Sequence, residues 1–252
     1  MDRVIAPPWD VLGSPDGPRI VFVQGSRISR SSWRPVMQQL AATCRMAAPD
    51  LPGHGELGDL PFTMDRALDV VDGAVEAVGG APVVLVGLSL GGYVATAYAA
   101  SHPDRVRGLV LAGATAEPTG PAASAFRLYA WVLAKAPQRP LDALNTWFFR
   151  RRYPADIAEP IVAGGYWSGG GAAAVRLLTG VRFRDLLVAY GGPILAINGE
   201  YDLVFRLGAR SYLRGLPNVT RRTLARATHL SPLDRPDAFA DAVQRFVERL
   251  PG

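Results

Sequence analysis

The sequence is poor in cysteine and histidine, with one cysteine and three histidines among its 252 residues. A single cysteine, Cys44, excludes an intramolecular disulfide and any metal cluster built on cysteines. The histidines, His54, His102 and His229, lie in unrelated segments, and none has the carboxylate–histidine spacing of a metal site. We therefore expect no metal and no other cofactor.

The sequence also lacks an apolar stretch suited to crossing a membrane. Residues 77–101 carry no charge, but Pro82 and five glycines interrupt them, and residues 83–86 are short and mostly β-branched. Such a run is typical of a parallel strand that is covered by helices on both faces. The first residues show no basic region followed by an apolar stretch, so no secretory signal is expected and a cytoplasmic location is the default expectation.

Charge of one sign is not concentrated anywhere in the chain. The net charge is +5, and almost all the positive charge comes from arginines scattered among acidic residues. The one tight run, residues 150–152, is shorter than the clusters that mark nucleic-acid surfaces, and no nucleic-acid-binding motif accompanies it. We expect a small-molecule substrate as the partner, and no nucleic acid.

Short apolar segments alternate with helical patterns, which is typical of a doubly wound, mostly parallel α/β sheet. The predicted strands are residues 19–24, 45–48, 83–88, 106–112, 193–198 and 219–224. The predicted helices are residues 32–42, 64–78, 90–100, 205–213 and 236–250. Residues 117–192 show helical patterns and no strand, so we expect a core of residues 1–116 and 193–252 with residues 117–192 as a helical lid. Open α/β sheets bind ligands at the carboxyl edge, where this lid would lie.

The first candidate for chemistry is a serine at the end of a predicted strand. Residues 87–91 read Gly-Leu-Ser-Leu-Gly, which matches the pattern Gly-x-Ser-x-Gly. The glycines allow a sharp strand-to-helix turn with Ser89 exposed at its apex, and the helix N-terminus behind it favours developing negative charge. The alternative is a glycine-rich turn with a capping serine. The strand before the motif and the helix after it favour Ser89 as a nucleophile.

A serine hydroxyl attacks well only when a base takes its proton. His54 lies in a tight turn after a predicted strand, and His102 ends the helix behind Ser89, away from the apex. His229 follows the last predicted strand, on a loop that can return to the carboxyl edge of the sheet. We therefore expect His229 to be the base.

The base in turn needs a buried carboxylate that holds the imidazole and stabilises its charged form. Asp202 follows the predicted strand 193–198 at the carboxyl edge and is the favoured candidate. Glu200, two residues away, and Glu117, at the start of the predicted lid, are the alternatives.

Taken together, these residues resemble the α/β-hydrolase family. The chain order Ser89, Asp202, His229 and the Gly-x-Ser-x-Gly turn match the family's pattern. Residues 50–55, Asp-Leu-Pro-Gly-His-Gly, and residues 101–106, Ser-His-Pro-Asp-Arg-Val, are similar to segments of lid-bearing members.

The resemblance runs from about residue 19 to residue 249 and leaves only the lid unmatched. It implies an oxyanion hole formed by two backbone N–H groups, those of Leu90 and Ser26. Relatives usually read His-Gly-x at the second position, whereas this chain has Gln24 in place of the histidine. Because backbone groups form the hole, this change leaves its donors available.

Three functions are compatible with these residues. The leading hypothesis is hydrolysis of a small carboxylic ester through an acyl-serine intermediate. An enol-lactone or carbon–carbon bond hydrolase acting on an acidic substrate is the second, because similar lid-bearing relatives use the same three residues. A catalytically silent ligand receptor is the third, and the complete set Ser89, His229 and Asp202 argues against it.

The predicted lid has more aromatic residues than a short helical insert needs for its own packing. We expect some of them to form an apolar pocket for small to medium uncharged esters. The candidates are Trp131, Trp147, Phe148, Phe149, Tyr166 and Trp167. Arg27, beside the expected oxyanion loop, offers an alternative, since it could hold a substrate carboxylate and favour an acidic lactone or a dienoic acid.

Overall fold

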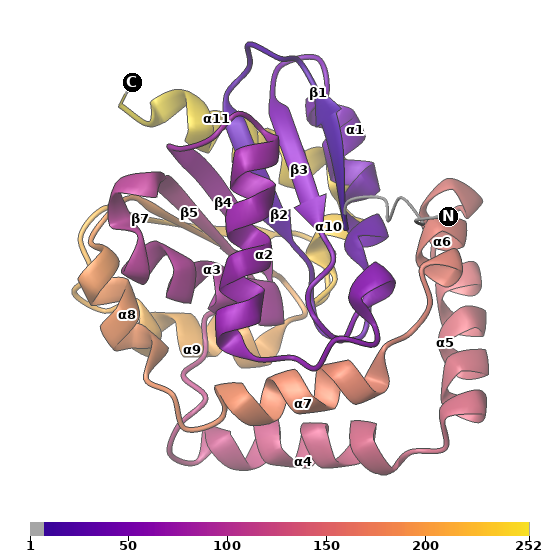
Figure 1. The fold of residues 1–252 in the computed structure, drawn as a ribbon. Helices are drawn as coiled ribbons and strands as arrows, with labels where there is room; N and C mark the ends of the chain where they lie inside the picture. The colour runs from indigo at the N-terminus through magenta and orange to yellow at the C-terminus, as the bar shows by residue number, and fades with distance from the viewer. Residues whose placement is uncertain (1–7, 252) are drawn as a thin grey trace.

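Seven strands form one central sheet, in the order β1-β3-β2-β4-β5-β6-β7 (Figure 1). The computed structural model describes residues 8–251. The strands are β1 (Trp9–Gly13), β2 (Arg19–Val23), β3 (Arg45–Pro49), β4 (Val83–Leu88), β5 (Val106–Ala112), β6 (Ile194–Gly199) and β7 (Val219–Leu224). β1 pairs antiparallel with β3, and all other neighbouring strands are parallel. The prediction of a mostly parallel α/β sheet is confirmed.

The six predicted strands are present, and β1 is the one that the sequence analysis missed. β4 is buried along its whole length, which explains its continuous apolar run. β1, by contrast, is an edge strand whose three central residues are exposed. Its sequence, Trp-Asp-Val-Leu-Gly, has no alternation of apolar and polar residues that would mark a half-buried strand.

Helices cover both faces of the sheet (Figure 1). Outside the segment between β5 and β6 they are α1 (Arg34–Leu40), α2 (Met64–Ala77), α3 (Leu90–Ser101), α9 (Leu203–Tyr212), α10 (Ser231–Asp234) and α11 (Pro236–Arg249), with short 3-10 turns η1 (Arg30–Trp33), η2 (Gly55–Leu57) and η3 (Pro103–Arg105). Buried residues of α2 and α3 form one core cluster with one face of the sheet. Those of α1 and α11 form a second cluster on the other face. No helix among residues 8–251 is long and apolar enough to cross a membrane.

The segment between β5 and β6 is helical, as predicted, and contains no strand. Its helices are α4 (Ala122–Lys135), α5 (Gln138–Arg152), α6 (Ala155–Ala163), α7 (Ser168–Leu178) and α8 (Phe183–Tyr190). α4 and α7 pack side by side across the carboxyl ends of the strands (Figure 1). α8 packs instead against α3, with Phe183 and Leu187 in the core cluster of that face. The division into a core and a lid of residues 117–192 stays a prediction, and α4–α7 are the helices that lie over the sheet's edge.

Candidate active site

Ser89 occupies the sharp turn between the end of β4 and the start of α3. Its backbone has φ 50° and ψ −114°, an uncommon conformation for a residue with a side chain. Two backbone hydrogen bonds hold the turn: the N–H of Ser89 donates to the carbonyl of Ala112 at 2.8 Å, and that of Gly92 donates to the carbonyl of Ser89 at 2.9 Å. Strained residues persist only where the surroundings hold them, and they cluster at functional sites.

The glycines beside Ser89 are required by close backbone contacts. A Cβ atom at Gly87 would lie 2.3 Å from the carbonyl oxygen of Gly91. A Cβ atom at Gly91 would lie 2.1 Å from the carbonyl oxygen of Val23, in β2. A side chain at position 87 would therefore collide with the first turn of α3, and one at position 91 would collide with β2. The strand–turn–helix context that the motif predicts is present.

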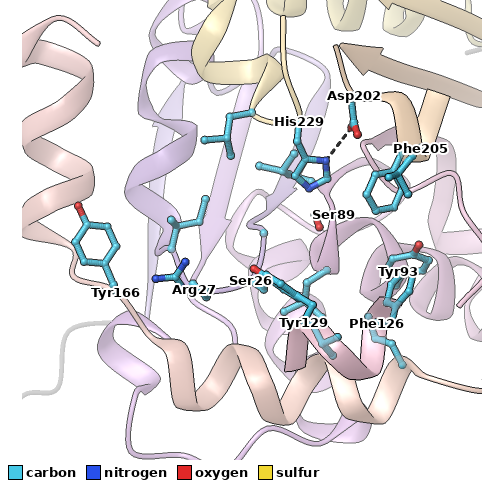
Figure 2. Close-up of a pocket in the computed structure, with 18 of the residues that line it drawn as sticks. Ser26, Arg27, Ser89, Tyr93, Phe126, Tyr129, Tyr166, Asp202, Phe205 and His229 are labelled. Carbon is cyan, nitrogen blue, oxygen red and sulfur yellow. Dashed lines mark hydrogen bonds and ion pairs between the residues drawn. The ribbon is translucent and has the colours of Figure 1, made fainter. Parts of the chain in front are cut away.

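His229 and Asp202 are brought together from the loops that follow β7 and β6. Nδ1 of His229 lies 2.8 Å from Oδ2 of Asp202, and the Asp202 side chain is buried. Phe205 stacks on the imidazole, with the ring centroids 4.9 Å apart. Figure 2 shows the imidazole between Asp202 and Ser89, with all three side chains in one pocket.

Two further residues, neither of them predicted from the sequence, support this pair. Gly113 directly follows β5 with φ +54°, and a Cβ atom there would lie 2.7 Å from Cε1 of His229. Asp234 accepts hydrogen bonds from the backbone N–H and the hydroxyl of Thr228, both at 2.6 Å, and so holds the loop that carries His229. Gly113 could have been identified from its position directly after β5, which is the strand next to β4. Asp234 has no comparable signal in the sequence.

The other two candidate carboxylates have different partners. Glu117 accepts a hydrogen bond from the backbone N–H of Arg184 at 3.1 Å, and its burial raises its pKa above the usual range. Glu200 accepts from the backbone N–H of Arg226 at 2.7 Å. Neither is hydrogen-bonded to His229 in the part of the chain that the structure describes.

The other two histidines are used in packing. His54 is fully buried, with Nδ1 at 3.0 Å from the carbonyl oxygen of Pro52, and burial lowers its pKa. His102 caps the end of α3 and stacks on Tyr98, with the centroids 4.6 Å apart. Neither of them lines the pocket that contains Ser89.

The loop after β2 lies against the turn that carries Ser89. Ser26 and Leu90 both line the pocket. Leu90 is the first residue of α3, so its N–H has no partner within the helix. The side-chain amide of Gln24 is buried between the carbonyl of Pro49 and the N–H of Leu51; with its NH2 group toward Pro49 it donates to that carbonyl at 2.7 Å and accepts from the N–H of Leu51 at 2.8 Å. Gln24 thus ties this loop to the end of β3.

The pocket has a volume of about 470 Å³ and is lined mostly by apolar and aromatic residues. Of the predicted lining residues, four are present: Arg27, Phe148, Phe149 and Tyr166. Its lining also includes residues that the sequence analysis did not single out: Tyr93, Phe126, Tyr129, Asn145, Val204 and Phe205. No group of three or more His, Cys, Asp or Glu side chains within residues 8–251 is arranged to hold a metal ion.

The three tryptophans among the candidates for the pocket, Trp131, Trp147 and Trp167, are not among its lining residues. Trp131 is 60% exposed and Trp147 is 63% exposed, because both project outward from α4 and α5. Trp167 packs instead against Gly58, where a Cβ atom would lie 2.1 Å from its ring, and its Nε1 donates to the carbonyl of Gly164 at 2.9 Å. Aromatic content alone does not tell which side of a helix faces a cavity.

Comparisons with known proteins agree with this architecture. A pimeloyl-[acyl-carrier protein] methyl ester esterase of Neisseria meningitidis serogroup C is 39% identical over 101 residues, which is 40% of this chain and 38% of that protein. The match therefore spans less than half the length of that relative. An esterase of the same description from Xanthomonas campestris pv. campestris (strain B100) is 30% identical over 96% of this chain and 99% of its own length.

Solved structures share the whole fold. A thermophilic esterase from Thermogutta terrifontis superimposes with a TM-score of 0.78 at 27% identity, over 96% of this chain and 92% of its own. The enol-lactonase from Burkholderia xenovorans LB400 does so with a TM-score of 0.74 at 22% identity, over 96% of each chain, and this likeness concerns the fold alone. The family model described as "Alpha/beta hydrolase family" matches residues 20–242. The chain therefore belongs to the α/β-hydrolase family.

Proposed function

We propose that this protein is a serine hydrolase that cleaves a carboxylic ester through an acyl-serine intermediate. The observation that carries the proposal is the 2.8 Å hydrogen bond between His229 and buried Asp202, in the same pocket as the strained Ser89. A ligand-binding module has no need of these three groups together. The esterase names of the relatives from Neisseria and Xanthomonas support ester cleavage.

In the first half of the reaction, Oγ of Ser89 attacks the ester carbonyl while Nε2 of His229 takes the hydroxyl proton. Asp202 holds Nδ1 and stabilises the imidazolium that forms. The backbone N–H groups of Ser26 and Leu90 donate to the oxyanion of the tetrahedral intermediate. The proton on Nε2 then passes to the leaving alcohol, and the acyl group remains on Ser89.

In the second half, water attacks the acyl group while His229 again acts as the base. The ester bond to Ser89 breaks, the proton returns to the serine oxygen, and the carboxylic acid leaves. Helices α4–α7 act as the lid in this proposal. Phe126 and Tyr129 of α4 and Phe148 of α5 line the same pocket as Ser89 and would exclude bulk water from it.

Hydrolysis of an enol-lactone remains the second candidate, because the same acyl-serine chemistry opens a lactone ring. The position of Arg27 in the pocket favours it for acidic lactones. A panel of p-nitrophenyl esters and lactones distinguishes the two. Cleavage of the esters is followed by release of p-nitrophenol, and hydrolysis of the lactones is followed by formation of the ring-opened acid.

The direct test is covalent labelling with a phosphonate probe, followed by identification of the modified residue. We expect one label, on Ser89, and its loss in both Ser89→Ala and His229→Ala. Turnover of the best ester should fall roughly 10⁶-fold in each variant, and the double variant should lose little more, because these residues act as a unit. Ester hydrolysis that survives at a near-normal rate in Ser89→Ala would exclude the proposal.

A further inference from the structure

One side of the pocket contains polar groups that the proposed ester chemistry does not use. Arg27, Asn145 and Tyr166 all line the pocket, from the loop after β2, from α5 and from the segment between α6 and α7. Figure 2 shows the Arg27 side chain extending toward Tyr166, on the side of the pocket away from Asp202 and Phe205. These three residues, here called the polar side, stand out among mostly apolar neighbours.

Arg27 is held in place by its backbone and by one end of its guanidinium. Its φ is +72°, outside the usual range for a residue with a side chain, and its carbonyl accepts from the N–H of Trp167 at 2.8 Å. Nε donates to the hydroxyl of buried Ser168 at 3.2 Å. No carboxylate among residues 8–251 forms an ion pair with Arg27, and its buried Nη2 has no hydrogen-bond partner there.

Its two neighbours also have unused hydrogen-bonding capacity. The buried Nδ2 of Asn145 has no partner within residues 8–251. The hydroxyl of Tyr166, near Thr146 and Asp142, makes no hydrogen bond of ordinary geometry within residues 8–251. Burial raises the pKa of Tyr166, with Asp142 adding to the effect, so the phenol keeps its proton and can donate. Asp142 itself does not line the pocket.

Buried donors without partners are costly, because they lose hydrogen bonds to water and gain none in the protein. Here three residues that line one pocket each have a buried donor atom without a partner, and one of them, Arg27, carries a full positive charge with no ion-pair partner among residues 8–251. A carboxylate accepts several hydrogen bonds at once and pairs with the planar fork of a guanidinium. An anionic substrate group in the pocket would give the Arg27 guanidinium the ionic partner that residues 8–251 do not supply.

We propose that Arg27, Asn145 and Tyr166 form a binding subsite for a substrate carboxylate. Together with the ester chemistry at Ser89, this makes half-esters of dicarboxylic acids the preferred substrate class: the ester lies at Ser89, the free carboxylate lies at the polar side, and the apolar walls hold the chain between them. The preference for half-esters rests on the proposed function, whereas binding of the carboxylate does not.

The kinetic test compares monomethyl dicarboxylates of increasing length with methyl alkanoates of matched length. The readout is the ratio of kcat/KM for the half-ester to that for the neutral ester. We expect the ratio to exceed one in the wild type at one preferred length. It should fall about 10- to 100-fold in Arg27→Gln, mainly through KM, as expected for loss of a charged hydrogen-bonded pair, and by a smaller factor in Tyr166→Phe.

The ratio separates binding from general damage. A disturbed loop at Arg27 would lower both rates and leave the ratio unchanged, whereas loss of the subsite lowers the half-ester rate selectively. Arg151→Gln is the matched control. Arg151 is exposed on α5 and does not line the pocket, so this substitution removes the same charge at a distant position. Its ratio should equal that of the wild type. An unchanged ratio in both Arg27→Gln and Tyr166→Phe would overturn the proposal.

A binding measurement keeps the subsite separate from the proposed reaction. The monoamide of the best dicarboxylic acid, titrated calorimetrically into Ser89→Ala, should bind, and the amide of the matched alkanoic acid should bind far more weakly. Adding Arg27→Gln should weaken binding of the monoamide about 10- to 100-fold. Equal binding of the acidic and neutral amides would refute the subsite even if ester hydrolysis at Ser89 is established. Selective binding of the acidic amide by Ser89→Ala, together with no ester hydrolysis by the wild type, would support the subsite and refute the proposed esterase.

Discussion

A methyl group at position 113 would test how the His229–Asp202 pair is held. In Gly113→Ala, the new Cβ atom would lie 2.7 Å from Cε1 and 2.8 Å from Nδ1 of His229, and 3.2 Å from Oδ2 of Asp202. Ordinary contacts between carbon atoms are about 3.5–4.0 Å. The imidazole must therefore move by roughly 1 Å, or the backbone at the end of β5 must move instead.

The displacement should lower both turnover and the free energy of unfolding. A misplacement of about 1 Å costs on the order of 100-fold in rate, and complete loss of the orienting carboxylate costs about 10⁴-fold. We therefore expect kcat to fall at least about 100-fold in Gly113→Ala. The left-handed φ costs about 1–2 kcal/mol for alanine, and the overpacking adds roughly 1–3 kcal/mol of lost folding free energy.

Gly120 provides a matched control. It has the same φ of +54°, but a Cβ atom there would meet nothing within 4 Å. Gly120→Ala therefore carries the backbone cost without the contact. The assay is steady-state hydrolysis of the best p-nitrophenyl ester, with urea unfolding of the wild type and both variants. A Gly113→Ala enzyme with a kcat within a few-fold of Gly120→Ala would refute the inferred role of the pair.

Two further predictions concern ionisable groups. Asp202→Asn should lower turnover near pH 7 roughly 10³- to 10⁴-fold, whereas Glu117→Gln should leave it close to that of the wild type, because Glu117 is bonded to a backbone N–H and not to His229. The opposite pattern in the same kinetic assay would move the acid to Glu117. His54 has a pKa lowered by burial, so below its ordinary value of 6.5 the unfolded chain binds a proton that the folded chain does not. The free energy of unfolding should then fall with pH below this value, by at most about 1.4 kcal/mol per pH unit from this group, and less steeply in His54→Asn. Equal slopes in urea titrations of the two proteins would contradict this.

Much of the fold was predictable because its signals are local. The apolar run of β4 marked its bounds, since a strand buried on both faces must be apolar along its length. The turn at Ser89 was predictable because the chain cannot turn so sharply without glycines at positions 87 and 91. β1 was missed because an exposed edge strand leaves little pattern in its sequence.

Strand topology allowed the region of the candidate site to be predicted, but not the contacts within it. Parallel strands end at one edge, so residues that follow them are brought near one another, and this placed Ser89, His229 and three candidate carboxylates in one region. Which carboxylate meets the imidazole depends on how three loops pack. The structure pairs His229 with Asp202, while backbone N–H groups hold the other two.

The sequence by itself determined the chain order of β2–β7, the sharp turn at Ser89 and the residue types available at the sheet's edge, because each depends on neighbours a few positions away. The tertiary structure alone decided which side chains line the pocket. Trp131 and Trp147 face outward, although the aromatic content of residues 117–192 suggested that they could line a pocket. Arg27 lines the pocket without an ionic partner among residues 8–251. The physical reason is that the face a helix or loop presents to a cavity is set by packing between segments distant in the chain.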